Sequence, residues 1–258
     1  MCSVVGMSTT DSLDAKTLRV IRLTAAAREG MWSVFRRYYD GISRAQFDRD
    51  LDAKQFVIVV RDEGGTVQGF STIAEYDVTV GGRSYRVVYS GDTILERRFW
   101  GYGGLQVAFA KHMLLAKLRT PGRPVYWFLI SKGYKTYLLL ARNFLSFWPR
   151  RDVAMESWQK DLVDTLATTK FGDQYDAEQG ILRALENGCR LKEEVAPLDA
   201  FTDPDIRFFA DSNPGHAMGD ELCCVGVVDM RALFHYLGKR LRKSPARARQ
   251  LVTRESTT

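Results

Sequence analysis

The chain has 258 residues, and its 37 lysines and arginines outnumber its 31 aspartates and glutamates, which gives a net charge of +6. Hydrophobic residues make up 45% of the sequence and charged residues 26%, with only 7 prolines. This composition is typical of a folded protein and excludes a disordered chain, a collagen-like repeat and a disulfide scaffold. The length allows one domain with a substantial core, or one domain with an extension.

The charge is unevenly distributed. Residues 1–89 carry a net charge of +1, 90–151 carry +9, 152–238 carry −10 and 239–258 carry +6. A pI near 9.1 would suggest nucleic acid or a membrane surface as a partner of the whole chain. Because the basic excess is confined to the middle and the tail, we expect a small phosphorylated ligand near 90–151 instead.

The first hundred residues predict short helices and strands. Residues 17–23 alternate polar and apolar side chains as a strand does, whereas 25–39 places its apolar residues at helical spacing. Gly81 and Gly82 separate two strand-like runs, which predicts a hairpin turn. We expect strands at 17–23, 56–60, 67–80 and 85–95, and helices at 25–39 and 43–53.

A glycine-rich turn, a helix, a strand and another helix are expected next. Residues 125–130 are continuously hydrophobic, which is typical of a strand covered on both faces. Helices are expected on either side of it, at 107–118 and 134–147. Hairpin strands followed by a β-α-β-α unit predict an α/β fold, with a mixed, mostly antiparallel sheet flanked by helices.

The sequence changes character after Pro149. We expect helices at 157–168 and 177–187, a loop-rich stretch at 197–220, a strand at 222–228 and a closing helix at 230–241. The predicted organisation is an N-terminal segment, an α/β domain, a mainly helical acidic extension and a basic tail, at residues 1–16, 17–151, 152–238 and 239–258.

The most informative stretch runs from Tyr89 to Gly104, where a strand leads through a glycine-rich turn into a helix. Amides at a helix N-terminus lack partners, and the helix dipole favours an anion there. Glycine lets the backbone approach a ligand closely, and Arg97 and Arg98 add positive charge. The stretch therefore predicts a phosphate site. It matches neither the P-loop pattern nor the dinucleotide-binding G-x-G-x-x-G.

Arg98-Phe99-Trp100-Gly101-Tyr102-Gly103 fits the pattern [R/Q]-x-x-G-x-[G/A]. Here the sequence resembles the GNAT acyltransferase superfamily, in which this pattern binds the pyrophosphate of coenzyme A between the fourth strand and the third helix. The resemblance covers residues 17–148 and implies acetyl-CoA or a longer acyl-CoA as the donor. The residues implied in donor binding are Thr93, Ile94, Leu95, Arg97, Arg98, Gly101, Tyr102, Gly103, Gly104 and Ser131. Lys132, at the same strand end as Ser131, is a further candidate contact to donor or substrate.

The resemblance also implies direct acyl transfer to an amine, which needs a base for the amine proton. Asp92 is the first candidate for this base and Glu96 the second, because they are the only carboxylates in 90–151. The structural alternative for Asp92 is a carboxylate that caps a bulge or turn. The alternative for Glu96 is an ion pair with Arg97 or Arg98.

An acid is needed to protonate the leaving thiolate, and the family often uses a tyrosine in the fourth helix. Tyr134 and Tyr137 are the candidates, three residues apart and on one helix face. The sequence departs from the family here, because Leu139 falls where the tyrosine is usual. Packing of Tyr137 in the core, with its hydroxyl hydrogen-bonded, is the alternative.

The acidic extension is expected to pack on or cover the site of the amine acceptor. Its loop 211–220, rich in glycine and proline, contains His216, which we name as the candidate acceptor-binding residue. No metal is expected, because the three histidines are widely separated and the four cysteines form no C-x-x-C pair. The cysteines are expected to be reduced.

The leading hypothesis is a cytoplasmic acyl-CoA-dependent N-acyltransferase that acts on a small-molecule amine. One alternative takes the acyl group from an acyl carrier protein, as N-acyl amino acid and acyl-homoserine-lactone synthases of similar fold do. The basic surface suits an acidic carrier, and Trp100, Trp127, Phe128 and Phe144 are candidates to line an acyl tunnel. A second alternative is a non-catalytic acyl-CoA-binding protein. Neither a signal peptide nor a membrane span is expected, and nucleic-acid binding by the tail ranks last.

Overall fold

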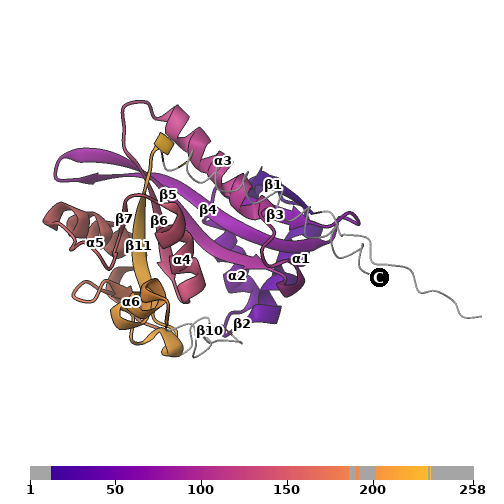
Figure 1. Cartoon of the computed structure of the whole chain (residues 1–258). Helices are drawn as coiled ribbons and strands as arrows, with labels where there is room; N and C mark the ends of the chain where they lie inside the picture. Colours follow the sequence, from indigo (N-terminus) through magenta and orange to yellow (C-terminus); the bar gives the residue numbers. More distant parts are fainter. Residues whose placement is uncertain (1–12, 186–189, 192–201, 232, 234–258) are drawn as a thin grey trace, which may run out of the picture.

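The computed structural model describes residues 13–185, 190–191, 202–231 and 233 (Figure 1). The basic tail and the greater part of the closing helix expected at 230–241 lie outside these residues, as does most of the N-terminal segment.

One mixed sheet forms the centre of the structure. Its order is β1-β3-β4-β5-β6-β11-β9-β8, and β7 also pairs with β11. All pairs among the described strands are antiparallel except β5 with β6. The strands are β1 (Asp14–Arg19), β3 (Phe56–Arg61), β4 (Val67–Val80), β5 (Arg83–Leu95), β6 (Val125–Ser131), β7 (Phe147–Trp148), β8 (Tyr175–Asp176), β9 (Ile181–Leu182) and β11 (Glu221–Val228). A separate two-stranded sheet joins β2 (Tyr39–Asp40) to β10 (Arg190–Leu191).

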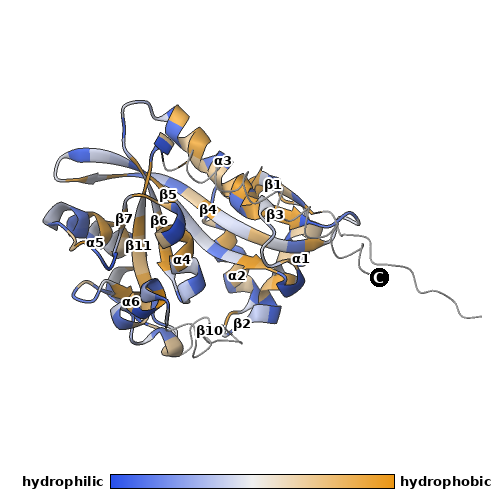
Figure 2. Ribbon diagram, viewed as in Figure 1, coloured by the Kyte–Doolittle hydropathy of each residue, from blue (hydrophilic) through white to orange (hydrophobic). Residues whose placement is uncertain are grey.

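Helices cover both faces of this sheet. Val57 and Val59 of β3 pack with α1 and α2, whereas the alternate residues Ile58 and Val60 pack with α3. By the same alternation along β5, α5 lies on the face of α1 and α2, and α4 lies on the face of α3. Hydrophobic residues follow the strands and the inward helix faces (Figure 2). The helices are α1 (Ala25–Tyr38), α2 (Arg44–Asp52), α3 (Gly104–Arg119), α4 (Tyr134–Asn143), α5 (Ser157–Phe171) and α6 (Pro204–Ser212), with short 3-10 turns at Val20–Arg22, Arg97–Phe99, Gly172–Gln174 and His216–Met218.

The predicted α/β class, and the strand and helix order up to β6, are confirmed. Three expectations are wrong. The helix expected at 177–187 is replaced, through residue 185, by the β8–β9 hairpin, where Gly180 adopts a positive φ of 69°. The loop-rich stretch contains α6, which Asp203 caps by accepting from the Asp205 amide. The helix expected at 134–147 ends at Asn143, and its last expected residue, Phe147, begins β7.

The acidic extension is built into the central sheet. Its strand β11 lies beside β6 in a seven-pair antiparallel ladder, from Leu222 opposite Ser131 to Val228 opposite Val125. Its helix α5 packs against β4 and β11. Residues on both sides of position 151 therefore share one sheet and one core.

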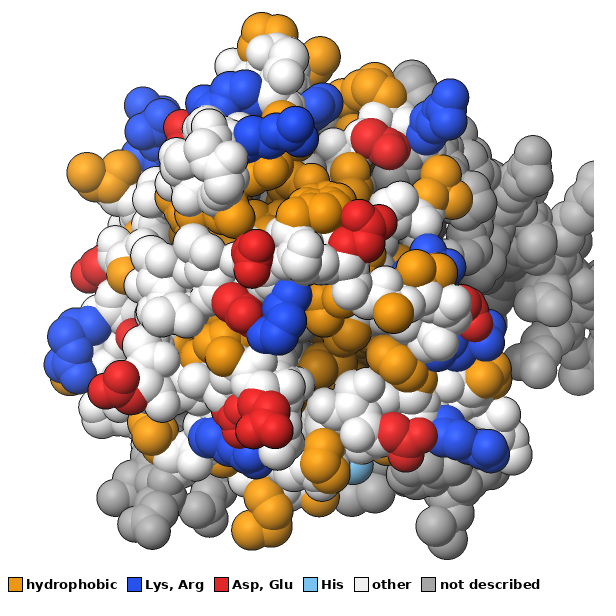
Figure 3. Space-filling model, turned by 90° about the vertical axis from the view of Figure 1, so that its left-hand side faces the viewer, with side chains coloured by type: hydrophobic (Ala, Val, Ile, Leu, Met, Phe, Trp, Pro, Cys, Tyr) orange, Lys and Arg blue, Asp and Glu red, His pale blue; other side chains and the backbone are white. Residues whose placement is uncertain are grey.

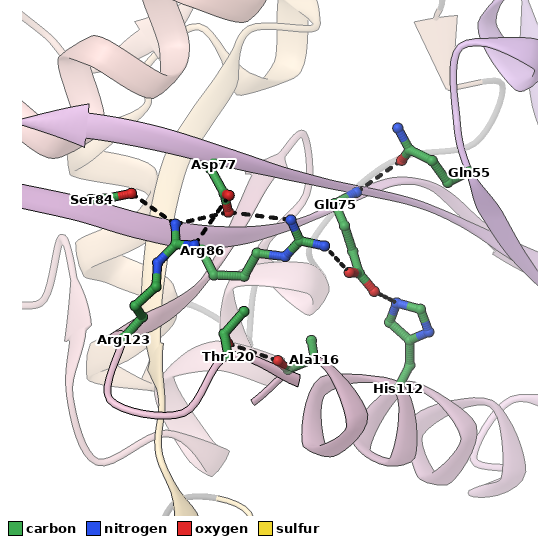
Figure 4. A network of polar contacts seen from close by, with 9 residues as sticks. All are labelled: Gln55, Glu75, Asp77, Ser84, Arg86, His112, Ala116, Thr120 and Arg123. Carbon is green, nitrogen blue, oxygen red and sulfur yellow. Dashed lines mark hydrogen bonds and ion pairs between the residues drawn. The ribbon is translucent and has the colours of Figure 1, made fainter. Parts of the chain in front are cut away.

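Buried charges tie α3 to the sheet. His112 of α3 points at Glu75 of β4, with 2.7 Å between Nε2 and Oε1, and Arg86 of β5 binds the other carboxylate oxygen (Figure 4). Arg86 and Arg123 also contact Asp77. Burial alone would raise the pKa of Glu75, but His112 and Arg86 together lower it to about 2. The network fixes where α3 sits against β4 and β5.

Candidate active site

The strands β5 and β6 separate at the centre of the sheet. Their parallel pairing stops at Ser90 opposite Leu129, while β5 continues to Leu95. The remaining edge of β5 therefore faces a gap instead of a neighbouring strand, so its N–H and C=O groups on that side are available to a ligand.

A β-bulge lies at the start of this gap. Ser71 pairs with Thr93 and Ile73 with Ser90, so two residues of β5, Gly91 and Asp92, oppose a single residue of β4. Gly91 is required by close packing: a Cβ there would lie 2.6 Å from Thr72 Oγ1. The bulge presents Asp92 to the gap.

A cavity of about 510 Å³ extends through the gap from one face of the sheet to the other. Its α3–α4 end is predominantly apolar, lined by Leu105, Phe109, Met113, Trp127, Leu139, Phe144, Val228 and Leu233. Its opposite end is charged, lined by Asp50, Lys54, Asp92, Lys132, Lys170 and Glu221. Viewed from the side of α5, the surface is hollowed, with hydrophobic side chains inside the hollows and acidic and basic ones around them (Figure 3).

Asp92 lies where the two ends meet. Burial raises the pKa of its carboxyl above the usual aspartate value, although Lys54 and Lys132 favour the charged form. Lys132 also forms an ion pair with Glu221, with 3.3 Å between its Nζ and the Oε1 of Glu221. Burial likewise raises the pKa of Glu221, and the Asp92 charge adds to this. The cavity thus contains two carboxylates whose pKa values are raised, which makes each a better proton acceptor than an ordinary carboxylate.

The N-terminus of α3 adjoins the cavity. Gly103 is its N-cap, and the first backbone bond of the helix runs from the Val107 amide to the Gly103 carbonyl (3.0 Å). The preceding amides of the first turn have no backbone acceptor among the described residues, as is usual at a helix start. Gly101 adopts φ 91°, which only glycine tolerates easily. Leu105 and Gln106, next along α3, line the cavity, so the turn and the cavity are continuous.

The arginines beside this turn are held by neighbouring side chains. Arg98 donates to Gln68 (3.1 Å) and lies over the Phe99 ring, and Arg97 lies over the exposed Trp100 ring. The hydroxyl of Tyr102 donates to the carbonyl of Leu13 and anchors the turn to the start of β1 (2.7 Å). Both arginines stay beside the predicted phosphate site.

Several predicted site residues lie outside the cavity lining. Glu96 accepts hydrogen bonds from Arg37 (2.5 Å) and from the Tyr38 hydroxyl (2.9 Å), so its ion pair is with α1 instead of with the arginines that follow it. Ile94 is buried against α1 and α2. Ser131 is buried and donates to the Gly133 carbonyl.

The two candidate acids are also placed outside it. Tyr137 is fully buried among aromatic rings, its hydroxyl donates to the carbonyl of Pro149 (3.1 Å), and burial raises its pKa. Tyr134 packs at the edge of the same core. This placement matches the core-packing alternative for Tyr137.

His216 and two of the four proposed tunnel aromatics are elsewhere. His216 Nδ1 lies 2.8 Å from the Asn213 carbonyl, and its ring contacts Phe209. Trp127 and Phe144 line the cavity as expected, whereas Trp100 and Phe128 do not.

The cavity contains charged residues that the sequence reasoning missed: Asp50, Lys54, Lys170 and Glu221. They come from the end of α2, the loop after it, the last turn of α5 and the start of β11. Only the assembled sheet brings these positions together, and no local motif marks them.

No helix in the described part of the chain has the length and apolar character needed to cross a bilayer. Within the same residues, no three His, Cys, Asp or Glu side chains are arranged to hold a metal ion. Cys223 and Cys224 are buried free thiols.

No protein-family model and no curated protein matches the sequence. Similar solved structures include a GNAT family N-acetyltransferase of Escherichia coli in complex with CoA, 17% identical over 53% of this chain and 74% of that one, with a TM-score of 0.37. Glucosamine-6-phosphate N-acetyltransferase of Arabidopsis thaliana is 11% identical over 57% and 99%, with a TM-score of 0.38. A probable N-acyltransferase of Enterococcus faecalis is 14% identical over 50% of this chain, with a TM-score of 0.39. This match covers only 32% of the length of that protein.

The strand order, the single parallel pair β5–β6 among the described strands and the glycine turn before α3 together define the class of fold. The chain has a GNAT-like α/β fold, as its resemblance to that superfamily implies.

Proposed function

We propose that the protein transfers an acyl group from a coenzyme A thioester directly to an amine. The observation that carries this proposal is the continuity of one cavity, which runs from the first turn of α3, through the β5–β6 gap, to the charged end beyond Asp92. A donor with a pyrophosphate at one end and a reactive thioester at the other fits this arrangement.

The donor would bind through backbone groups. The amides of Gly103 and Gly104 would hold the pyrophosphate, with Arg97 and Arg98 beside it, while the Tyr102 amide is bound to the Phe99 carbonyl (2.9 Å). The pantetheine arm would run along the open edge of β5, where Thr93–Leu95 have no partner strand on the β6 side. This pairing would direct the thioester to the bulge at Asp92.

In the proposed reaction, the amine nitrogen attacks the thioester carbonyl and forms the amide bond, and the carbon–sulfur bond breaks. Asp92 takes the proton that the amine loses, which its raised pKa favours. The thiolate of coenzyme A leaves and is protonated. Tyr134 remains a proposed acid, while the buried hydroxyl of Tyr137 is committed to Pro149.

The apolar end of the cavity favours a donor with a longer acyl chain than acetyl. Phe109, Trp127 and Phe144 form a continuous aromatic wall there, with ring centroids 5.1–5.2 Å apart. A longer chain would bury its methylene groups against this wall, at about 0.8 kcal/mol for each. Either acyl-CoA or an acyl carrier protein could supply such a chain.

The test is release of free thiol from acetyl-CoA, octanoyl-CoA and octanoyl carrier protein, with a mixture of amines as acceptors. We expect turnover, faster with an octanoyl donor than with acetyl-CoA. Leu139→Trp, which fills the apolar end, should reduce octanoyl transfer at least tenfold and spare acetyl transfer. Binding of acyl-CoA without thiol release would identify a non-catalytic acyl-CoA-binding protein instead.

A further inference from the structure

Two lysines at the charged end of the cavity lack an acidic partner. Lys54 and Lys170 are both half-buried in its lining. Lys54 donates to the backbone carbonyl of Asp50 (3.0 Å), and neither lysine forms an ion pair with a carboxylate among the described residues. By contrast, Lys16, Lys132 and Lys160 are each paired with a carboxylate, as Lys160 is with Asp164 (2.7 Å).

Both lysines are directed to one aromatic ring. The Nζ atoms of Lys170 and Lys54 lie 4.2 and 5.8 Å from the centroid of the Tyr89 ring. Tyr89 is itself buried and is packed between Phe128 and Phe171. The ring fixes the position of the two ammonium groups at the mouth of the β5–β6 gap. Lys54 passes close to Gly91, because a Cβ added at Gly91 would lie 3.2 Å from Lys54 Cε.

The two positive charges oppose each other. Burial and the nearby Lys54 charge together lower the pKa of Lys170 to about 8, while Asp50 acts in the opposite direction. An anion bound between the two ammonium groups would remove this repulsion. Placing two lysines together in a cavity costs stability, and such arrangements are concentrated at binding sites.

Carboxylates stand beside these lysines in the same end of the cavity. Asp50 and Asp92 lie near Lys54, and Glu221 is paired with Lys132. This end of the cavity therefore presents both acidic and basic groups, with Asp92 at the gap and Lys170 in the last turn of α5 beside Phe171. A ligand that carries both an amine and an anion complements this arrangement.

We propose that the amine acceptor also bears an anionic group, a carboxylate or a phosphate, and that Lys54 and Lys170 bind this group while Asp92 faces the amine. This inference rests on the proposed acyl transfer for its use of the amine, but the anion site itself does not depend on the donor. The apolar side chains of Tyr39, Ile42 and Phe171 line the same end and leave room for a partly apolar body.

Lysine labelling tests the anion site without any acceptor. The full-length protein is given a short pulse of acetic anhydride at pH 8, and the modification of each lysine is measured by mass spectrometry. The probes are inorganic phosphate and acetate, with sodium chloride at equal ionic strength as the reference. We expect one of the two anions to slow labelling of Lys54 and Lys170 at least threefold, with Lys160 unchanged. Equal labelling in all three salts, or equal protection of Lys160, overturns the proposal.

Paired acceptors test the same site by turnover. Amino acids are compared with their carboxamides, and O-phosphoethanolamine with ethanolamine, using octanoyl-CoA as donor. We expect the anionic member of an accepted pair to have a kcat/KM at least 100-fold higher, mainly through KM. In the double variant Lys54→Met/Lys170→Met this preference should fall below tenfold. A neutral amine that is accepted equally well, or a preference that survives the double variant, contradicts the proposal.

Titration of CoA separates this inference from the proposed function. The double variant should bind CoA with unchanged affinity, because the expected pyrophosphate site lies at α3. A tenfold loss of CoA affinity would assign the lysines to the donor and overturn the acceptor assignment. If the wild-type protein does not bind CoA but an anion still protects Lys54 and Lys170, the donor proposal fails and the anion site stands.

Discussion

The indole of Trp127 donates a hydrogen bond from Nε1 to the hydroxyl of Ser90 (2.9 Å), across the two strands at the point where they separate. Ser90 is the last residue of β5 that pairs with β6, and Trp127 forms part of the apolar wall of the cavity. One buried side-chain bond thus fixes both the end of the parallel pairing and the orientation of the wall.

Loss of this bond should destabilise the protein. Ser90→Ala leaves the buried indole N–H without a partner, which costs about 1–3 kcal/mol of unfolding free energy. Trp127→Phe made in addition to Ser90→Ala removes the orphaned donor, so the two losses should not add. Urea denaturation of the single and double variants measures the coupling. Strictly additive losses would show that the bond contributes nothing.

Replacement of Asp92 should abolish catalysis without unfolding the protein. We expect Asp92→Asn to lower kcat/KM for amine acylation by a factor of 10² to 10⁴. Because burial raises the pKa of Asp92, its charged form is the less stable one in the fold, so the variant should melt at the same temperature or higher. In the wild type, kcat/KM should rise with pH through a pKa above the usual aspartate range.

Glu96→Gln is the matched control, because this carboxylate is bound to Arg37 and Tyr38 outside the cavity lining. Its kcat/KM should stay within about threefold of wild type. The assignment of the base to Asp92 is wrong if Glu96→Gln is the inactive variant and Asp92→Asn retains activity.

The hydroxyl of Tyr137 is expected to stabilise the fold and not to act in catalysis. Tyr137→Phe removes its bond to the Pro149 carbonyl, at a cost of about 1 kcal/mol. Steady-state rates across pH 6–10 should keep their wild-type shape. If this variant is folded but its rate no longer decreases at high pH as that of the wild type does, Tyr137 is the catalytic acid after all.

The ion network at Glu75 should make stability sensitive to acid. The folded pKa is about 2, below the ordinary glutamate value of 4.5, so the stabilisation is fully present above the unfolded pKa and is lost as the pH falls towards 2. The difference corresponds to something on the order of 3 kcal/mol. The gap in unfolding free energy between wild type and Glu75→Gln should shrink between pH 5 and pH 3. A constant gap over this range would mean that Glu75 does not titrate as described.

Regular patterns allowed most of the fold to be predicted from the sequence. The expected bounds of β4 agree exactly with the structure, and those of α1 differ by one residue, because both have long periodic runs between clear turns. The helix predicted at 177–187 was wrong because Gly180 interrupts the helical periodicity there and forms the turn of the β8–β9 hairpin. Tertiary pairing with β11 overrides local preference there.

The candidate site could be predicted only on the donor side. The glycine turn and Asp92 belong to one continuous segment, so local sequence marks them. Lys54, Lys170 and Glu221 come from three distant segments that meet only when the sheet forms. The sequence also suggested Tyr137 from its helical position, but helical spacing does not show which face is turned to the core.

The central claim is that the turn before α3 and the adjoining gap bind coenzyme A. Isothermal titration of CoA measures this directly in wild type, in Gly103→Glu, and in the control Gly64→Glu, which adds the same charge in the turn between β3 and β4. We predict 1:1 binding by wild type and Gly64→Glu, and at least a 30-fold loss in Gly103→Glu, because a carboxylate at the N-cap repels the pyrophosphate. Absence of binding by wild type, or equal affinity in all three proteins, would contradict the account.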